Sequence, residues 1–201
     1  MDIVEIQPWE TLSSTTAFTS PWLKVRKDVV RTNRGTVTDY YVVERFDYVV
    51  VVALTAESQV LTVRQYKHGA GQVVRELPAG YIEGSEDPLL CARRELREET
   101  GYEAEEIVPL GVLFASPSAS AHRAHLFLAT GLHQVGEQML DANEKIAVEK
   151  MDFTAAVEAA ASNRDFADLS STTALCMAWF HLRTNRKELK DAKRDWGEER
   201  A

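Results

Sequence analysis

The sequence predicts an α+β protein, an α/β/α sandwich built around a mixed or antiparallel β-sheet. Two observations carry this prediction: Val- and Tyr-rich runs of strand length outnumber helical segments, and one amphipathic helix interrupts them near the middle of the chain. The runs of strand length are 48–54, 60–66, 73–77, 107–115, 124–129 and 145–151. Helices are expected at 154–161 and 169–182, and the charge-rich stretch 183–200 is expected to be an exposed helix.

A small β subdomain is expected before the sandwich. Residues 22–32 and 36–44 are rich in Val and Tyr, and they flank Asn33-Arg34-Gly35, a sequence typical of a hairpin turn. We therefore assign residues 1–45 to an N-terminal β-hairpin subdomain and residues 46–201 to the main domain.

Composition predicts a soluble protein of the cytoplasm with no membrane association. The chain has 201 residues, 45% of them hydrophobic and 27% charged, which are ordinary globular values. No apolar run approaches the roughly 20 residues of a membrane span, and the N-terminus lacks the pattern of a signal peptide. The two cysteines, Cys91 and Cys176, do not make a disulfide framework.

The charge distribution argues against a nucleic-acid-binding module. The net charge is −8, and residues 83–106 hold nine acids against three arginines. Such a surface repels the phosphates of a nucleic acid. It is compatible with an enzyme that requires cations and acts on a small phosphorylated molecule.

The amphipathic helix is predicted from its two ends. Asp87 is a suitable N-cap and Pro88 a suitable first helical residue, while Gly101 is a suitable left-handed C-terminal cap. About three turns therefore run over residues 88–100. An apolar stripe for the core is formed by Leu89, Ala92 and Leu96.

Three acids of this helix, Glu95, Glu98 and Glu99, fall on another face. Two carboxylates at about 5 Å repel each other by roughly 3 kcal/mol at an effective dielectric constant near 20, so the cluster requires a counter-charge. Oxygen-only ligands favour Mg²⁺ or Mn²⁺ over zinc. The alternative is a solvated acidic helix face, but the glycine-containing loop 76–84 before the helix suits close backbone approach to a ligand, which a surface helix does not need.

The whole pattern resembles the Nudix box with no fixed position missing. It consists of Gly80, five residues, Glu86, seven residues, then Arg94-Glu95-Leu96-Arg97-Glu98-Glu99-Thr100-Gly101 and the apolar Tyr102. Features outside the box resemble the ADP-ribose pyrophosphatase group of Nudix hydrolases. These are the β subdomain, VRQYK at 63–67, ELPAG at 76–80, Pro117 about fifteen residues after the box, and HLFLA at 125–129.

The resemblance implies a metal site and a reaction. It implies that the carbonyl of Ala79 and the carboxylates of Glu95, Glu98 and Glu99 bind metal, and that Arg94 holds the glutamates in place. Two or more Mg²⁺ or Mn²⁺ ions about 4 Å apart would bridge a diphosphate and activate a water molecule. In this group ADP-ribose is hydrolysed to AMP and ribose 5-phosphate.

The sequence departs from the group at the catalytic base. Where many relatives have a glutamate after the proline, this chain has His122, and in the loop 141–146 the first expected glutamate is Ala142. Glu144 is retained there, and our hypothesis is that it orients or deprotonates the water, with Glu98 as the competing candidate. His122 is a solvated loop residue, a contact to the terminal ribose phosphate, or a base near neutral pH.

Substrate contacts are also implied by the resemblance. Adenine stacks on aromatic residues of the N-terminal subdomain, often from the partner subunit of a homodimer, and Trp22 is our preferred stacking residue. The alternative is that Trp22 belongs to the hairpin or dimer core. Arg64 and Lys67 are expected to contact the diphosphate. Pro117 is expected to be a substrate-binding residue, because ADP-ribose hydrolysing members of the group have a proline at this position.

Three classes of function stay open. The first is hydrolysis of ADP-ribose or a related nucleoside diphosphate sugar such as GDP-mannose. The second is hydrolysis of a dinucleotide or a damaged nucleoside triphosphate, which Pro117 and the N-terminal subdomain speak against. The third is a non-catalytic sensor of ADP-ribose; the complete box speaks against it, whereas the altered base loop keeps it open.

Overall fold

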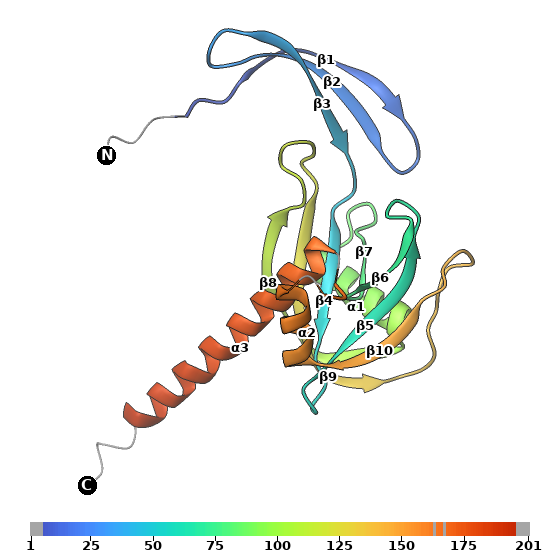
Figure 1. Ribbon diagram of the computed structural model, residues 1–201, viewed down its shortest axis with the longest axis vertical. Coiled ribbons are helices and arrows are strands. Elements are labelled where there is room, and N and C mark those ends of the chain that lie inside the picture. The colour runs from blue at the N-terminus through green and yellow to red at the C-terminus, as the bar shows by residue number, and fades with distance from the viewer. Residues whose placement is uncertain (1–5, 163, 167, 196–201) are drawn as a thin grey trace. The chain divides into compact units, whose positions relative to one another are not determined.

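The computed structural model describes residues 6–162, 164–166 and 168–195, with the backbone alone for 185–195. The chain divides into two compact units (Figure 1). One unit contains Met1–Asp47 and Leu113–Arg123, and the other contains Tyr48–Val112 and Ala124–Ala201. The segment 113–123 was not assigned to the N-terminal part from sequence.

The N-terminal unit is a three-stranded antiparallel sheet in the order β1-β2-β3. Its strands are β1 (Glu10–Thr19), β2 (Lys24–Arg31) and β3 (Val37–Glu44). The predicted hairpin is present, because β2 and β3 pair around a turn in which Gly35 has φ = 81° and donates its N–H to the Thr32 carbonyl at 2.8 Å. β1 was missed, since its run of Ser and Thr lacks apolar alternation. Ala119 joins this unit by accepting the Val43 N–H at 2.8 Å.

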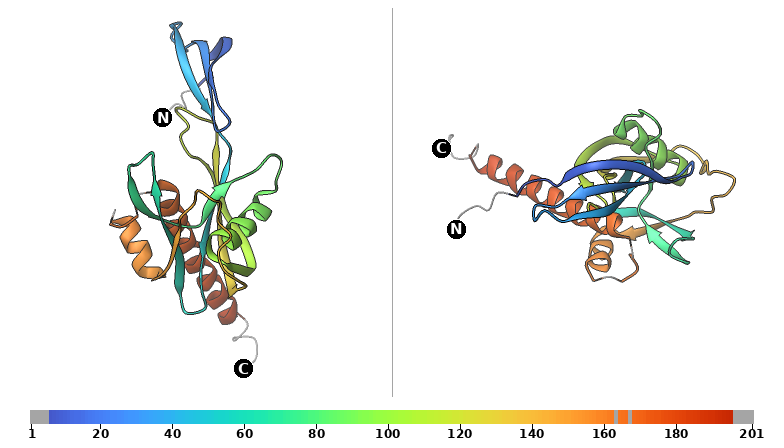
Figure 2. Two further views of the ribbon diagram at one scale, coloured as in Figure 1. Left: turned by 90° about the vertical axis from the view of Figure 1, so that its right-hand side faces the viewer. Right: turned by 90° about the horizontal axis from the view of Figure 1, so that it is seen from above.

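The described residues of the second unit form two sheets and three helices (Figure 2). A four-stranded mixed sheet has the order β7-β4-β9-β8, and a three-stranded antiparallel sheet has the order β10-β5-β6. The strands are β4 (Tyr48–Ala53), β5 (Gln59–Lys67), β6 (Gln72–Glu76), β7 (Ala79–Tyr81), β8 (Tyr102–Phe114), β9 (Arg123–Gln134) and β10 (Ala147–Asp152). The helices are α1 (Pro88–Thr100), α2 (Phe153–Ala161) and α3 (Leu169–Asp195).

Strand β4 is the centre of this unit, and it is buried on both faces. Val49 and Val51 pack with Leu96 of α1, whereas Val50 and Val52 pack with residues of α2 and α3. Because successive side chains of a strand point to opposite faces of the sheet, β4 contributes residues to two hydrophobic cores, one on each side. The predicted α+β sandwich with a mixed sheet is confirmed.

The amphipathic helix begins and ends at the predicted residues. The Asp87 carboxylate accepts the N–H of Leu89 at 2.8 Å, and Gly101 ends the helix in the left-handed region at φ = 76°. Strand β8 starts directly after this glycine, five residues before the expected strand. Helix α3 extends the expected helix to Asp195; residues 196–200 of the expected exposed helix lie outside the described residues. No helix in the described part of the chain combines the length and the apolar character that crossing a membrane requires.

Gly101 provides a stability test. A Cβ at Gly101 would overlap the Gly136 carbonyl oxygen, whereas a Cβ at Gly71, which also has positive φ (67°), would meet nothing within 4 Å. Gly71→Ala should therefore lower the free energy of unfolding only by the cost of placing a Cβ-bearing residue in the left-handed region, about 1–2 kcal/mol. Gly101→Ala should lower it by a further 1–3 kcal/mol or so, because overpacking adds to the strain. Urea denaturation measures both losses, and equal losses would contradict the close packing at Gly101.

Candidate metal and catalytic site

The side chain of Arg94 on α1 donates hydrogen bonds to three glutamates of the box. Its Nη1 donates to Glu95 Oε1 at 2.7 Å and to Glu98 Oε2 at 3.0 Å. Its Nε and Nη2 donate to the two carboxylate oxygens of Glu86 at 3.1 and 3.0 Å, and Nη2 also reaches the Tyr81 carbonyl at 3.2 Å. Arg94 thus links α1, strand β7 and the loop between them, and it lowers the pKa of the Glu86 carboxyl.

Glu99 connects the helix to the loop before it. Its side chain is buried, and its Oε2 accepts the N–H of Ala79 at 3.0 Å. Burial raises the pKa of the Glu99 carboxyl to about 8; the charges of Glu95 and Glu144 add to this, while the Ala79 N–H and Lys67 oppose it.

Gly80 lets the loop backbone lie directly against a box carboxylate. A Cβ at Gly80 would overlap the carboxylate of Glu95. The Glu95 side chain is only 12% exposed, and burial raises the pKa of its carboxyl, opposed by Arg94. The glycine of the predicted loop is thus required by close approach to the helix.

The donor chemistry of this cluster fits a hard divalent cation. Carboxylate oxygens of Glu95, Glu98 and Glu99 and the backbone of Ala79 come together, and oxygen donors are those that Mg²⁺ and Mn²⁺ prefer. Within the described residues, no three His, Cys, Asp or Glu side chains by themselves form a preassembled metal centre. Instead, Arg94 supplies the positive charge that Glu95 and Glu98 contact.

Glu144 lies in a short exposed turn beyond β9. Its N–H donates to the Asp141 carbonyl at 2.9 Å, and its Oε2 accepts the Asp141 N–H at 3.2 Å. Burial is the main cause that raises the pKa of Glu95 and of Glu99, and the charge of Glu144 adds to the rise in both.

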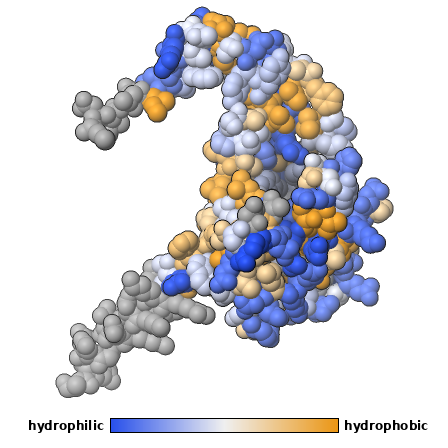
Figure 3. Space-filling view, in the orientation of Figure 1, coloured by the Kyte–Doolittle hydropathy of each residue, from blue (hydrophilic) through white to orange (hydrophobic). Residues whose placement is uncertain are grey.

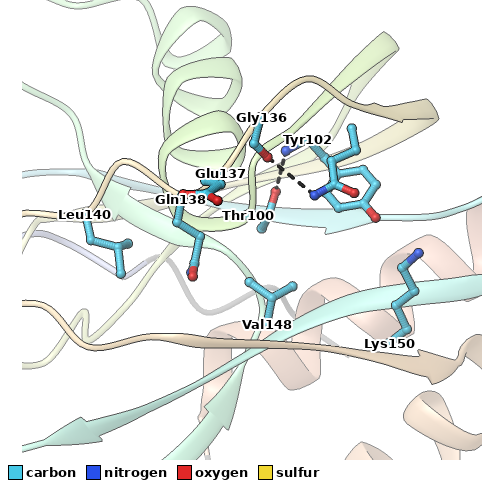
Figure 4. Close-up of a pocket in the computed structure, with 9 residues that line it drawn as sticks. Thr100, Tyr102, Gly136, Glu137, Gln138, Leu140, Val148 and Lys150 are labelled. Atoms are coloured by element: carbon cyan, nitrogen blue, oxygen red, sulfur yellow. Dashed lines mark hydrogen bonds between the residues drawn. The ribbon is translucent and has the colours of Figure 1, made fainter.

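The segment after β9 contacts the C-terminal turn of α1. Gln138 Nε2 donates to the Glu99 carbonyl at 2.6 Å, and Met139 N–H donates to the Glu98 carbonyl at 2.8 Å. Gln138 also lines an open cleft of about 620 Å³ between this segment and β10, together with Val148 (Figure 4). Sequence reasoning missed Gln138, because nothing local marks a residue whose partner lies 39 positions away.

The two predicted diphosphate contacts differ in their surroundings. Lys67 Nζ pairs with Glu76 Oε2 at 3.0 Å, and its charge lowers the pKa of Glu99. Arg64 lies 3.9 Å from Glu149 Oε1 on β10. The charge of Lys67 therefore partly offsets the effect of burial on Glu99.

Trp22, Pro117 and His122 belong to the N-terminal unit. Trp22 is 74% exposed and lines a hollow of about 230 Å³ with Leu23 and Phe46. Pro117 is exposed in a turn that the Ser120 N–H closes on the Ser116 carbonyl at 2.8 Å. The His122 Nδ1 lies 2.6 Å from Ser120 Oγ, and burial lowers the pKa of His122, with Arg45 adding to the effect.

Two family comparisons together cover most of the chain. Residues 45–170 match the NUDIX domain, and residues 9–43 match the nucleoside diphosphate sugar hydrolase N-terminal domain. A solved crystal structure of an ADP compounds hydrolase superposes with a TM-score of 0.79 at 20% identity, covering 90% of this chain and 97% of that one.

Two relatives are named ADP-ribose pyrophosphatase. The protein from Mycobacterium tuberculosis (strain ATCC 25618 / H37Rv) is 40% identical over 129 residues, which is 64% of this chain and 62% of that protein. The protein from Bacillus subtilis (strain 168) is 30% identical over 145 residues, 72% of this chain and 78% of that protein. The alignment thus spans less than two thirds of the mycobacterial relative. Because the NUDIX match alone covers more than half of the residues and includes the whole glutamate cluster, the chain belongs to the Nudix family.

Proposed function

We propose that this protein hydrolyses the pyrophosphate bond of ADP-ribose or a related nucleoside diphosphate sugar, releasing a nucleoside monophosphate and a sugar phosphate. The observation that carries the proposal is that Arg94 bonds to Glu95 and Glu98, and the Ala79 N–H bonds to Glu99, all in the C-terminal half of α1. The names of the two relatives and the match of residues 9–43 favour a nucleoside diphosphate sugar as the substrate class.

The chain's own residues have distinct roles in this proposal. Glu95, Glu98, Glu99 and the Ala79 carbonyl would hold the metal, since all four offer oxygen donors. Two or more Mg²⁺ or Mn²⁺ ions, when bound, supply positive charge to the diphosphate and lower the pKa of a water molecule. Arg94 keeps the glutamates in place through its contacts to Glu86, Glu95 and Glu98.

Glu144 is the proposed base for the attacking water. It is exposed, so its carboxylate is accessible to water, and its charge adds to the burial that raises the pKa of Glu95 and of Glu99. Glu98 is the competing candidate, but its carboxylate is engaged by Arg94 at 3.0 Å.

Five residues are proposed to contact the substrate. Lys67 and Arg64 would contact the diphosphate, with Lys67 favoured by its effect on Glu99. Trp22 would stack on the base, since it is a large and exposed aromatic side chain beside a hollow. Pro117 is also proposed as a substrate-binding residue, and His122 would contact the terminal ribose phosphate.

We further propose that the N-terminal sheet forms a homodimer contact. All ten residues of β1 are exposed, and orange patches lie among blue and white ones on the N-terminal unit in Figure 3. The exposed large hydrophobic and aromatic side chains of this unit include Trp9, Leu12, Phe18, Trp22, Val37, Tyr41 and Phe46. Burial of such side chains against a second copy would remove apolar surface from water. Sedimentation of the full chain tests this, and a monomer at micromolar concentration would reject it.

A substrate panel tests the proposed activity. The full chain is incubated with Mg²⁺ or Mn²⁺ and with ADP-ribose, ADP-glucose, GDP-mannose, a dinucleoside diphosphate or a nucleoside triphosphate, and the released phosphorylated products are measured. Faster turnover of ADP-ribose than of GDP-mannose and the triphosphate is expected. Preference for GDP-mannose would move the assignment within the same class, and no turnover of any compound would favour a sensor of ADP-ribose.

Glu144→Gln tests the proposed base. The change removes the proton acceptor but keeps the size of the side chain, so kcat for ADP-ribose should fall by about 10²-fold or more with KM nearly unchanged. Steady-state kinetics at saturating Mg²⁺ measures both constants. His122→Gln, made in parallel, should change kcat much less; the reverse order of effects would transfer the role to His122.

A further inference from the structure

The C-terminal carbonyls of α1 are used to anchor another segment. A helix leaves its last carbonyls without partners inside the helix, and they must be satisfied elsewhere. Here the carbonyls of Glu98, Glu99 and Gly101 accept hydrogen bonds from Met139 N–H at 2.8 Å, Gln138 Nε2 at 2.6 Å and Val135 N–H at 2.9 Å. Two of these donors are backbone groups, and the third is a side-chain amide.

The Gln138 amide also reaches the far end of the loop. The same Nε2 donates to the Ile146 carbonyl at 3.2 Å. Ile146 is buried, whereas residues 141–145, which include Glu144, are exposed. One half-buried amide therefore connects the last turn of α1 to the residue at which the loop returns to the core (Figure 4 shows Gln138 at the edge of the cleft).

We propose that Gln138 is a positioning residue for hydrolysis: its side-chain amide fixes the loop 139–146 against α1 and thereby sets where the Glu144 carboxylate lies relative to the glutamates of the helix. The inference rests on the function proposed above for Glu144. Met139 holds the start of the loop through the Glu98 carbonyl, and Ile146 holds its end by burial. Gln138 is the side chain that bonds to both regions.

The hydrogen bonds of Gln138 connect the loop that carries the proposed base to the helix that carries the proposed metal ligands. The carboxylates of Glu98 and Glu99 belong to the proposed metal site, and their backbone carbonyls accept hydrogen bonds from Met139 and Gln138. One turn of α1 therefore positions both the proposed metal ligands and the loop 139–146 that carries Glu144. A displacement of about 1 Å of a reacting group is enough to reduce a rate by up to about 10²-fold. Loss of the amide is therefore expected to lower kcat without removing a group that touches substrate.

Gln138→Met tests the anchoring directly, without reference to activity. Methionine has a similar length but no hydrogen-bond donor. Hydrogen exchange of the backbone amides in residues 139–146 should become about fivefold faster or more, the factor expected when one net hydrogen bond is lost from a local opening equilibrium. Gln134→Met is the matched control, because Gln134 lines the same cleft but its Nε2 donates within its own segment, to the Gly136 carbonyl at 3.4 Å. Unchanged exchange in Gln138→Met, or equal acceleration in both variants, would overturn the proposal.

A double-mutant cycle with Glu144 tests the link to catalysis. In the otherwise unchanged chain, Gln138→Met should lower kcat for ADP-ribose about tenfold or more with KM within about twofold. In the Glu144→Gln background the same change should have little further effect, because the group that it positions is already lost. An equal loss in both backgrounds would overturn the positioning role while leaving the proposed hydrolysis intact. A normal rate in Glu144→Gln alone would reject the base assignment and the positioning role with it.

Discussion

Replacing Glu98 by Gln is expected to lower kcat for ADP-ribose by about 10³-fold while the fold is retained. Glu98 is 36% exposed, and its carboxylate bonds to Arg94 at 3.0 Å, so an amide of the same size fits the same space. The amide lacks the negative charge that a divalent cation requires, and metal ions contribute several kcal/mol to stabilising such transition states. Kinetics at several Mg²⁺ concentrations, together with Mn²⁺ binding measured by electron paramagnetic resonance, check the two effects.

The control for Glu98 is another glutamate outside the cluster. Glu106 is exposed on β8, and Glu106→Gln removes the same single charge. Its rate and its Mn²⁺ affinity should stay close to those of the unchanged protein. If Glu98→Gln retained normal Mn²⁺ affinity and normal turnover, the glutamates of α1 would not be the metal site.

Gly80→Ala is expected to be the most damaging single-methyl change in the site. The new Cβ would overlap the Glu95 carboxylate, so either that side chain or the loop of Ala79 must move. Because Arg94 bonds to both Glu95 and Glu98, displacement of Glu95 also disturbs its neighbour. A fall of about 10²-fold in kcat is expected from such misplacement, with weaker Mn²⁺ binding.

Gly69→Ala is the matched control for Gly80→Ala. Neither glycine has positive φ, so neither substitution introduces left-handed strain, but a Cβ at Gly69 would meet nothing within 4 Å. Gly69→Ala should therefore keep normal activity and a normal melting temperature. Equal activity of the two variants would show that the loop does not need to approach Glu95 closely.

The parts of the fold that could be predicted from the sequence are those with a local cause. Helix α1 has its bounds set by an N-cap carboxylate, a proline and a left-handed glycine within a few residues of its ends, so its prediction is confirmed at both termini. Strands β4, β5 and β9 follow from apolar runs, and the β2–β3 turn follows from Gly35. The short strand β7 (Ala79–Tyr81) was not predicted, because it lies in the segment expected to be a loop. The family, too, was recognisable from one contiguous stretch, because its residues have fixed spacings.

Other parts required contacts between residues far apart in the chain. Strand β1 has no apolar pattern, and its pairing with β2 supplies the hydrogen bonds that define it. The segment 113–123 joins the N-terminal unit, and the Ala119 carbonyl in it accepts a hydrogen bond from Val43, which lies 76 residues earlier in the chain (119 − 43).

The sequence by itself determined the helix that carries Glu95, Glu98 and Glu99, since the spacing of residues within a helix places side chains on a face. Only the tertiary structure decided which residues contact this helix. Gly80 lies close to the Glu95 carboxylate, the Ala79 N–H donates to Glu99, and the Gln138 amide donates to the Glu99 carbonyl. The reason is that a local pattern selects backbone conformation through short-range sterics and hydrogen bonds. The position of a distant loop depends instead on which unsatisfied carbonyls and buried side chains it meets when the sheets and helices pack.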